Sequence, residues 1–253
     1  MATALVTGAS SGLGAEFARQ LAARGADVVL VARDEGALER VAAELTASFG
    51  VRAEVLVADL LDPAQRSAVE ARLADRERPV DVLVNNAGYG LPLAFEANDI
   101  EDEARHLAVH VEAPMRLMHA ALPVMLARGS GRIINVASVA GLMPRSTYGA
   151  VKGWLVSFSR WANVRYADRG VTVTAVCPGF VHTNFHERLG MPPGEEGVPA
   201  WMWLDKELVV REGLAAAARG KAVSIPSWRY RALVALSRLL PDRVVIASAS
   251  RGR

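Results

Sequence analysis

Short apolar runs alternate with longer amphipathic stretches along most of the chain. Several of the short runs are apolar at every position, which is typical of parallel strands that are covered on both faces. They predict strands at 2–6, 27–32, 52–58, 80–84, 132–137, 171–176 and 222–225. Apolar residues at helical spacing predict helices between the strands, at about 12–24, 35–49, 63–77, 98–127 and 147–168.

This alternation predicts an α/β protein with a Rossmann-like, doubly wound parallel sheet of about seven strands and helices on both faces. The 253 residues fit a single domain over 1–253, and 51% of them are hydrophobic, which is enough to fill one large core. The chain shows no internal boundary, short-period repeat or low-complexity tract.

One segment, 183–206, breaks the alternation. Its Met191-Pro192-Pro193-Gly194 run excludes a continuous helix, and Trp201 and Trp203 follow it. A long irregular segment in a compact domain is often a binding loop. Because this one follows the sixth strand, we expect a substrate loop that acts as a lid; the alternative is a surface excursion whose aromatic rings pack on the core.

Charge and cysteine content narrow the possible functions. The formal net charge is +2 and no basic stripe with interleaved aromatics is present, so we expect no nucleic-acid partner. The single cysteine, Cys177, excludes an intrachain disulfide and fits a reducing compartment. With no signal-peptide pattern at the start, we expect a cytoplasmic location.

The C-terminal residues, 227–253, are expected to form a helix and a tail. The helix candidate at 228–240 is amphipathic, and we expect it to pack on the domain or on a partner subunit rather than on a membrane. No uninterrupted apolar stretch of the chain is long enough to span a bilayer, so we expect no membrane association.

A glycine-rich loop, Thr7-Gly8-Ala9-Ser10-Ser11-Gly12-Leu13-Gly14, follows the first predicted strand. Such a loop allows a tight turn, lets the backbone approach a pyrophosphate, and presents the N–H groups of a helix N-terminus to the anion. The alternative is a plain turn between strand and helix. The residues we expect to contact a dinucleotide are Gly8, Ser10, Ser11, Gly12, Leu13 and Gly14.

The end of the second strand distinguishes the two nicotinamide dinucleotides. An NAD site usually has a carboxylate there for the ribose 2′-hydroxyl, whereas this chain has Ala32-Arg33-Asp34. A guanidinium binds a 2′-phosphate through charge-assisted hydrogen bonds, so we expect NADP(H) rather than NAD(H). Two alternatives remain: Asp34 pairs with Arg33 or caps the next helix, and Arg33 is a solvated loop residue.

Tyr148 and Lys152 are four residues apart in a predicted helix and therefore share a face. Tyrosine has an ordinary pKa of about 10, and a nearby ammonium lowers it. Tyr148 can then exchange a proton with a substrate hydroxyl. Ser138, just beyond the fifth strand, can hydrogen-bond the reacting oxygen. In the alternative, Tyr148 and Lys152 are a surface pair and Ser138 caps a helix.

With these motifs the chain resembles the short-chain dehydrogenase/reductase family, closely over 1–183 and loosely beyond. The motifs that carry the resemblance, in the family's order, are TGASSGLG at 7–14, Asp59-Leu60, Asn85-Asn86-Ala87-Gly88, Ser138, Tyr148 with Lys152, and Pro178-Gly179-Phe180-Val181-His182-Thr183. The resemblance implies hydride transfer between a nicotinamide and a carbonyl or secondary alcohol. It also implies a homodimer or homotetramer formed through the helices at 98–127 and 147–168.

The resemblance implies roles for the matched residues. Ser138 orients the substrate carbonyl, Tyr148 is the general acid in reduction, and Lys152 also binds the nicotinamide ribose. Asn85 ties neighbouring strands together. The remaining cofactor contacts that it implies are Asp59 and Leu60 beside the adenine, Asn86, Ala87 and Gly88 on the ribose side, and Pro178, Gly179, Val181 and Thr183 at the nicotinamide.

Two departures from the family's pattern keep a second hypothesis open. His110 stands where the family often has an asparagine that supports a proton path to the lysine, and we include it among the catalytic candidates. The interval between Ser138 and Tyr148 is also shorter than usual. The second hypothesis is a redox sensor or scaffold that binds NADP(H) with little turnover; a sugar-nucleotide epimerase is a third, disfavoured by the short chain.

Two histidine pairs and a set of apolar residues complete the candidates. His106 with His110, and His182 with His186, have helical spacing but no third ligand, so we expect no metal site. We expect a substrate that is bulky and apolar near the reacting carbon. The candidates for its pocket wall are Tyr89, Leu91, Phe95, Met143, Phe185, Trp201 and Trp203.

Overall fold

The computed structural model describes residues 2–92, 94–183 and 198–249 of the chain. Within them a seven-stranded parallel sheet has the order β3-β2-β1-β4-β5-β6-β9. The predicted Rossmann-like fold class is therefore confirmed. The strands of this sheet are β1 Thr3–Thr7, β2 Asp27–Ala32, β3 Ala53–Val57, β4 Val82–Asn85, β5 Gly131–Val136, β6 Val171–Val176 and β9 Val223–Ser224.

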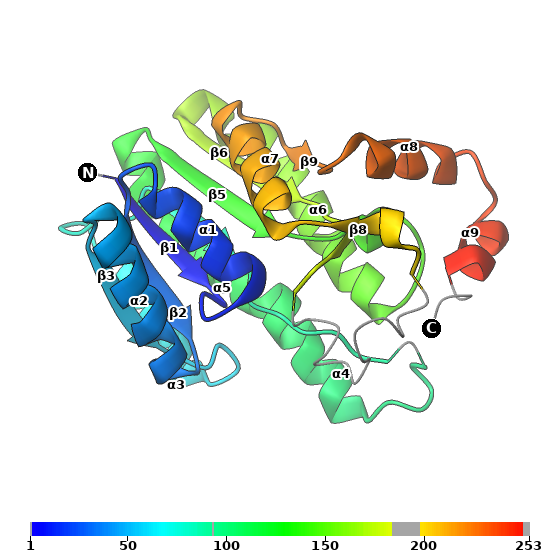
Figure 1. Ribbon diagram of the computed structural model, residues 1–253, viewed down its shortest axis with the longest axis horizontal. Helices are drawn as coiled ribbons and strands as arrows, with labels where there is room; N and C mark the ends of the chain where they lie inside the picture. Colours follow the sequence, from blue (N-terminus) through cyan, green and yellow to red (C-terminus); the bar gives the residue numbers. More distant parts are fainter. Residues whose placement is uncertain (1, 93, 184–197, 250–253) are drawn as a thin grey trace.

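Helices cover both faces of the sheet (Figure 1). Along each strand the side chains alternate between the faces, so Val6 joins the core under α1 and α7, while Leu5 joins the core under α3, α5 and α6. The helices are α1 Gly12–Ala22, α2 Glu35–Phe49, α3 Pro63–Ala74, α4 Ile100–Leu107, α5 Ala113–Arg128, α6 Thr147–Tyr166, α7 Lys206–Ala218, α8 Trp228–Ser237 and α9 Asp242–Ala249.

The predicted helix at 98–127 is not continuous. A π-helical turn, η1 (Ala108–Glu112), separates α4 from α5 and contains the buried His110. Such a turn adds a residue to the helical repeat and is frequently found at functional sites. Apolar periodicity alone did not reveal this break.

The region after β6 also differs from the prediction, which had no helix between 168 and 228. Helix α7 follows the α-helical pattern, with Val209, Val210, Leu214 and Ala217 buried on one side. A two-stranded parallel sheet forms from β7 (Phe180–Val181) and β8 (Trp203–Leu204). Most of the expected lid, 184–197, lies outside the described residues.

At the C-terminal end, α8 and α9 extend beyond the β9 edge of the sheet (Figure 1). The predicted helix at 228–240 is thus shorter than expected, and α9 was not predicted. None of the helices in the described part of the chain combines the length and apolarity that crossing a membrane requires.

The strand order places a crevice at the carboxyl ends of the central strands β1 and β4. The chain leaves β1 toward β2 on one side and returns to β4 on the other, so the loops after β1 and β4 diverge at the carboxyl ends of these strands. Doubly wound sheets bind ligands at such a switch point. The predicted glycine loop and the 85–88 motif are therefore neighbours in space.

Candidate active site

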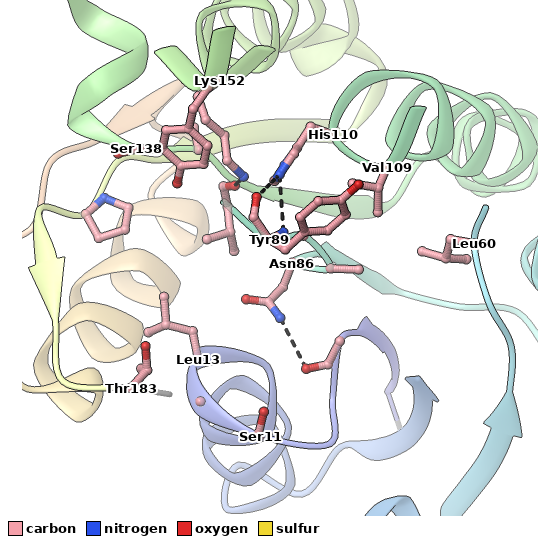
Figure 2. Close-up of a pocket in the computed structure, with 18 of the residues that line it drawn as sticks. Ser11, Leu13, Leu60, Asn86, Tyr89, Val109, His110, Ser138, Lys152 and Thr183 are labelled. Carbon is pink, nitrogen blue, oxygen red and sulfur yellow. Dashed lines mark hydrogen bonds between the residues drawn. The ribbon is translucent and has the colours of Figure 1, made fainter. Parts of the chain in front are cut away.

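A cavity of about 940 Å³ opens at the carboxyl ends of the strands. It brings together residues from all six of the motifs that carry the resemblance, with Arg33 and His110 beside them. Those that line it are Gly8, Ser10, Ser11, Gly12, Leu13, Arg33, Asp59, Leu60, Asn86, Ala87, Gly88, His110, Ser138, Tyr148, Lys152, Pro178, Gly179, Val181 and Thr183. Gly14 is absent from this lining and instead lies at a packing contact. Figure 2 shows Ser138, Lys152 and His110 across the cavity from Ser11 and Leu13.

The glycine loop has the backbone that its sequence requires. Gly8 and Gly12 have φ values of 65° and 58°, in the left-handed region that favours glycine. A Cβ on Gly14 would lie 2.1 Å from the carbonyl oxygen of Gly8, so only glycine allows α1 to start this close to the loop. The Ser11 side chain does not cap α1, and no acidic residue lies in its first turn.

This N-terminus without a side-chain cap differs from those of α2, α3 and α4. The Asp34, Asp62 and Asp99 carboxylates accept hydrogen bonds from the first turns of α2, α3 and α4. The first N–H groups of α1 have no such carboxylate and face the cavity beside Gly12 and Leu13. These groups and the helix dipole suit a phosphate oxygen, so the residues present fit a dinucleotide pyrophosphate.

Asn86 fixes the glycine loop against the loop after β4. Its side-chain amide donates to the carbonyl oxygen of Thr7 at 2.9 Å, and the Thr7 hydroxyl accepts from the backbone N–H of Asn86 at 2.9 Å. The same amide also donates to the carbonyl oxygen of Gly8 at 3.3 Å (Figure 2). One residue earlier, at the end of β4, the Asn85 amide donates to the side-chain oxygen of Asn135 in β5 at 2.9 Å. The implied role of Asn85 in tying β4 to β5 is therefore confirmed.

Arg33 projects from the end of β2 with its side chain 74% exposed. Its guanidinium lies 3.9 Å from the carboxylate of Asp59, which is an ion pair at the limit of the distance range. Asp34 does not pair with Arg33 but caps α2, where it accepts from the N–H of Ala37 at 2.9 Å. One of the two alternatives for Asp34, helix capping, is thus observed.

Lys152 is buried, and its ammonium donates to the carbonyl oxygen of Val136 at 2.8 Å. Its Nζ lies 5.7 Å from the centre of the Tyr148 ring. Burial disfavours the charged form and lowers the Lys152 pKa from 10.5 to about 7. Gly141 permits this packing, because a Cβ there would lie 2.5 Å from the Lys152 backbone.

Ser138 ends the extended segment after β5 at the cavity wall. Its hydroxyl accepts from the N–H of Ala140 at 3.1 Å and caps the short helix Val139–Leu142. The capping alternative is therefore observed, and it is compatible with a second role. An accepted N–H leaves the hydroxyl hydrogen available for an oxygen in the cavity.

His110 lies between the loop after β4 and Tyr148. Its Nε2 is 2.7 Å from the carbonyl oxygen of Tyr89, which it contacts as a donor in the Nε2-protonated tautomer (Figure 2). Gly88 makes room for it, because a Cβ there would lie 2.2 Å from the imidazole Cε1. Burial holds the pKa of His110 well below its ordinary value, so the ring is neutral.

His106 is a neighbour of the catalytic candidates that sequence reasoning missed in this role. It is fully buried, its ring centre is 4.5 Å from that of His110, and it lies 6.0 Å from the Tyr148 ring. Burial lowers its pKa as well. Its spacing from His110 had suggested only a metal pair, and the described residues contain no group of three or more metal-ligating side chains.

The cavity is lined mostly by other residues than the apolar ones expected. Among the described apolar candidates only Tyr89 lines it. Phe185 lies outside the described residues. The charged residues Asp102, Arg105 and Arg145 also line the cavity, and no motif had indicated them. They come from α4 and from the short loop before α6, where a sequence pattern cannot show which side chains point inward.

Comparisons with known proteins agree with this geometry. The family "short chain dehydrogenase" matches residues 2–192. Oxidoreductase UcpA of Escherichia coli K12 is 35% identical over 198 residues, which cover 77% of this chain and 74% of that protein.

Two solved structures are also similar over nearly the whole chain. A short-chain dehydrogenase from Sphingobium yanoikuyae, in complex with NADPH, is 35% identical, has a TM-score of 0.85, and is matched over 94% of both chains. A bulky-bulky ketone specific alcohol dehydrogenase from Comamonas testosteroni is 31% identical with a TM-score of 0.81, over 94% of this chain and 92% of that one. The fold, the motifs and these matches together place the chain in the short-chain dehydrogenase family.

Proposed function

We propose that this protein is an NADP(H)-dependent oxidoreductase that interconverts a carbonyl compound and a secondary alcohol. The observation that carries the proposal is one cavity lined by the glycine loop and by Ser138, Tyr148 and Lys152. The Sphingobium short-chain dehydrogenase was solved with NADPH, which supports the choice of cofactor.

Different residues around the cavity would bind different parts of the cofactor. The glycine loop and the N-terminus of α1 would hold the pyrophosphate, and Leu60 the adenine. Arg33 would bind the 2′-phosphate, because its exposed guanidinium is only loosely paired with Asp59. The cofactor would supply or accept the hydride. The residues at 178–181 would form the wall on the nicotinamide side.

Proton transfer would take place at the hydroxyl of Tyr148. In reduction this hydroxyl donates its proton to the substrate oxygen, which Ser138 orients through its hydroxyl hydrogen. The resulting phenolate is stabilised by the Lys152 ammonium, 5.7 Å from the ring centre. In alcohol oxidation the same groups act in the opposite order.

His110 would have a supporting role beside Tyr148. Its neutral imidazole holds the Tyr89 backbone and packs edge-on against the Tyr148 ring, with 5.7 Å between ring centres. This contact restricts the Tyr148 ring on one side. We propose that His110 takes the place of the family's asparagine in this sense, by fixing the geometry around the tyrosine.

The size of the cavity and one structural relative support a bulky substrate. After a dinucleotide is bound, space must remain beside Ser138 and Tyr148 for a carbonyl compound, and the Comamonas relative is specific for bulky-bulky ketones. We propose a bulky ketone that is apolar near the reacting carbon. We also propose a cytoplasmic homodimer or homotetramer.

The decisive test is NADPH and NADH consumption with a panel of ketones and aldehydes. NADPH-preferring turnover is expected, and Tyr148→Phe should lower kcat by about 10²- to 10⁴-fold, because the general acid is lost. Tyr166→Phe is the matched control, since Tyr166 ends the same helix, packs against Trp161 and does not line the cavity. Its turnover should stay unchanged.

The outcomes separate the possible functions. Turnover that survives in Tyr148→Phe would contradict the assigned mechanism. Turnover with NADH alone would contradict the role of Arg33 and leave the catalytic assignment intact. NADPH binding without consumption of any panel member would favour the sensor or scaffold hypothesis.

A further inference from the structure

The two stems of the segment between β7 and β8 meet at one buried hydroxyl. The backbone N–H of Phe180, in β7, donates to the hydroxyl oxygen of Tyr230 at 3.0 Å. The Tyr230 hydroxyl in turn donates to the carbonyl oxygen of Met202, just before β8, at 2.6 Å. A single side chain from α8 thus links both stems, one through an accepted and one through a donated hydrogen bond.

Gly179 is the reason that the Tyr230 ring can come so close. A Cβ on Gly179 would lie 1.8 Å from the Cζ atom of the ring, so the ring occupies the space of the missing side chain. Tyr230 is 3% exposed and belongs to the hydrophobic core beneath α1 and α7. The ring therefore supports the back of the cavity wall, whose inner side is lined by Gly179 and Phe180.

Helix α8 is itself held in place by polar contacts at its start. The N–H of Ser227, which has a φ of 71°, donates to the Glu212 carboxylate of α7 at 3.2 Å. The Arg231 guanidinium lies 3.8 Å from the same carboxylate. Arg229 donates to the carbonyl oxygen of Trp201. These contacts fix the start of α8, and thereby the position of Tyr230.

We propose that Tyr230 is a positioning residue for the cofactor, holding the nicotinamide-side wall at 178–181 through Gly179 and the Phe180 amide. Tyr230 does not line the cavity, so it acts only through these neighbours. The inference rests on the proposed function, because it takes this wall to be a cofactor contact. It gives the C-terminal helix α8 a part in a site whose motifs all precede it in the chain.

The test is Tyr230→Phe, which keeps the ring against Gly179 and removes only the hydroxyl. The Kd for NADPH, measured by fluorescence titration, and the KM for NADPH should each rise by about 3- to 10-fold, the equivalent of about one ordinary hydrogen bond. The wall binds the cofactor equally in ground and transition states, so kcat should change by less than about twofold.

Ser159→Ala is the matched control. The Ser159 hydroxyl is also fully buried, accepts one hydrogen bond from Asn135 and donates one to the Leu155 carbonyl oxygen. It does not line the cavity. Its loss should lower Tm as Tyr230→Phe does, but leave the Kd and KM for NADPH unchanged. Equal losses of Tm in the two variants with no change in either Kd would overturn the proposal.

Hydrogen–deuterium exchange supplies a readout that needs no cofactor. The Phe180 amide should exchange faster in Tyr230→Phe than in the wild type or in Ser159→Ala, because its acceptor is removed. Unchanged exchange at 180 would refute the link to Tyr230 whatever the activity. Faster exchange at 180 in Tyr230→Phe, together with a wild-type protein that binds neither NADPH nor NADH, would instead refute the proposed function, and with it the cofactor role of Tyr230.

Discussion

At the residue scale, the burial of Lys152 disfavours the charged form of its side chain. Lys152 is 4% exposed, and its ammonium donates to the carbonyl oxygen of Val136, a neutral acceptor. Burial therefore lowers its pKa to about 7. A lysine that can lose its charge near neutrality is well placed to respond when the neighbouring Tyr148 ionises.

This burial predicts a pH dependence of stability in the absence of cofactor. Because the folded-state pKa of Lys152 is about 7 against 10.5 when exposed, the unfolded chain binds more protons between these values, and the free energy of unfolding rises with pH. The free energy of unfolding of the wild type minus that of Lys152→Met should therefore become more positive with pH, by up to about 1.4 kcal/mol per pH unit. Urea unfolding at several pH values between 7 and 8.5 measures this difference.

The upper limit of pH 8.5 isolates Lys152 from its buried neighbour Cys177. Burial raises the pKa of the Cys177 thiol to about 12, so the unfolded chain loses that proton first and stability falls as pH rises above about 9. Cys177 is present in both proteins, so the difference between them should cancel its contribution. Parallel pH profiles for wild type and Lys152→Met would contradict the lowered pKa of Lys152.

Arg33 carries a second prediction at this scale. Arg33→Ser should lower the ratio of kcat/KM for NADPH to that for NADH by about 10- to 100-fold, since hydrogen bonds to charged groups contribute about 1.5–3 kcal/mol. Initial rates with the two cofactors measure the ratio. Arg219→Ser, at an exposed arginine that ends α7 outside the cavity lining, should leave the ratio unchanged. A similar fall in both variants would indicate a general charge effect.

At the element scale, replacing a glycine by alanine should have opposite effects on stability in α1 and in α2. A Cβ on Gly14 would lie 2.1 Å from a backbone oxygen, whereas the nearest atom to one on Gly36 is the Arg40 Nη1 at 3.6 Å. The first contact fixes α1 against the glycine loop. The second leaves room for a side chain in the first turn of α2.

We therefore expect Gly14→Ala to lower the free energy of unfolding by about 1–3 kcal/mol or more, and to weaken NADPH binding, because the overlap displaces the glycine loop. Gly36→Ala should raise the free energy of unfolding by about 0.5 kcal/mol, because alanine restricts the unfolded chain. Urea unfolding of both variants measures this contrast. Equal destabilisation would contradict the close contact at Gly14.

Sequence prediction of the elements was most successful where local pattern and tertiary packing agree. The strand at 27–32 and the helix at 35–49 match β2 and α2, which have a buried apolar run and an aspartate cap with a terminal glycine. The motifs also predicted most of the cavity lining, because they follow parallel strands, and the carboxyl ends of parallel strands lie along one side of the sheet. The π-helical turn at His110 was not visible, because apolar periodicity does not register one added residue, and the contacts of His110 with Gly88 and Tyr89 are made to a distant part of the chain.

At the scale of the whole molecule, a group of large apolar side chains remains exposed on the helices predicted to form an interface. Its described members are Leu107 on α4, Met115 on α5, and Trp161 and Val164 on α6, with exposures of 54%, 44%, 54% and 80%. Where such side chains come together on a surface, they mark a site of interaction. We expect this one to be the contact in the proposed homodimer or homotetramer.

Val164→Glu should therefore shift the protein toward monomer, because a carboxylate would be buried without a partner at the interface. Size-exclusion chromatography with light scattering measures the mass. Leu239→Glu, at a residue 81% exposed beyond α8, is the control and should leave the mass unchanged. Dissociation of Leu239→Glu alone would place the interface on the C-terminal helices instead, and a monomeric wild type would contradict the assembly.

The contact between Phe180 and Tyr230 has a consequence for biosynthesis. A ribosome releases the glycine loop, the 85–88 motif and the Ser138–Tyr148 region well before α8, and domains begin to fold during synthesis. The acceptor for the Phe180 amide is fifty residues further along the chain. A nascent chain can thus form most of the sheet while one wall of the cavity still lacks its support. Completion of the site is delayed until α8 has also left the ribosome.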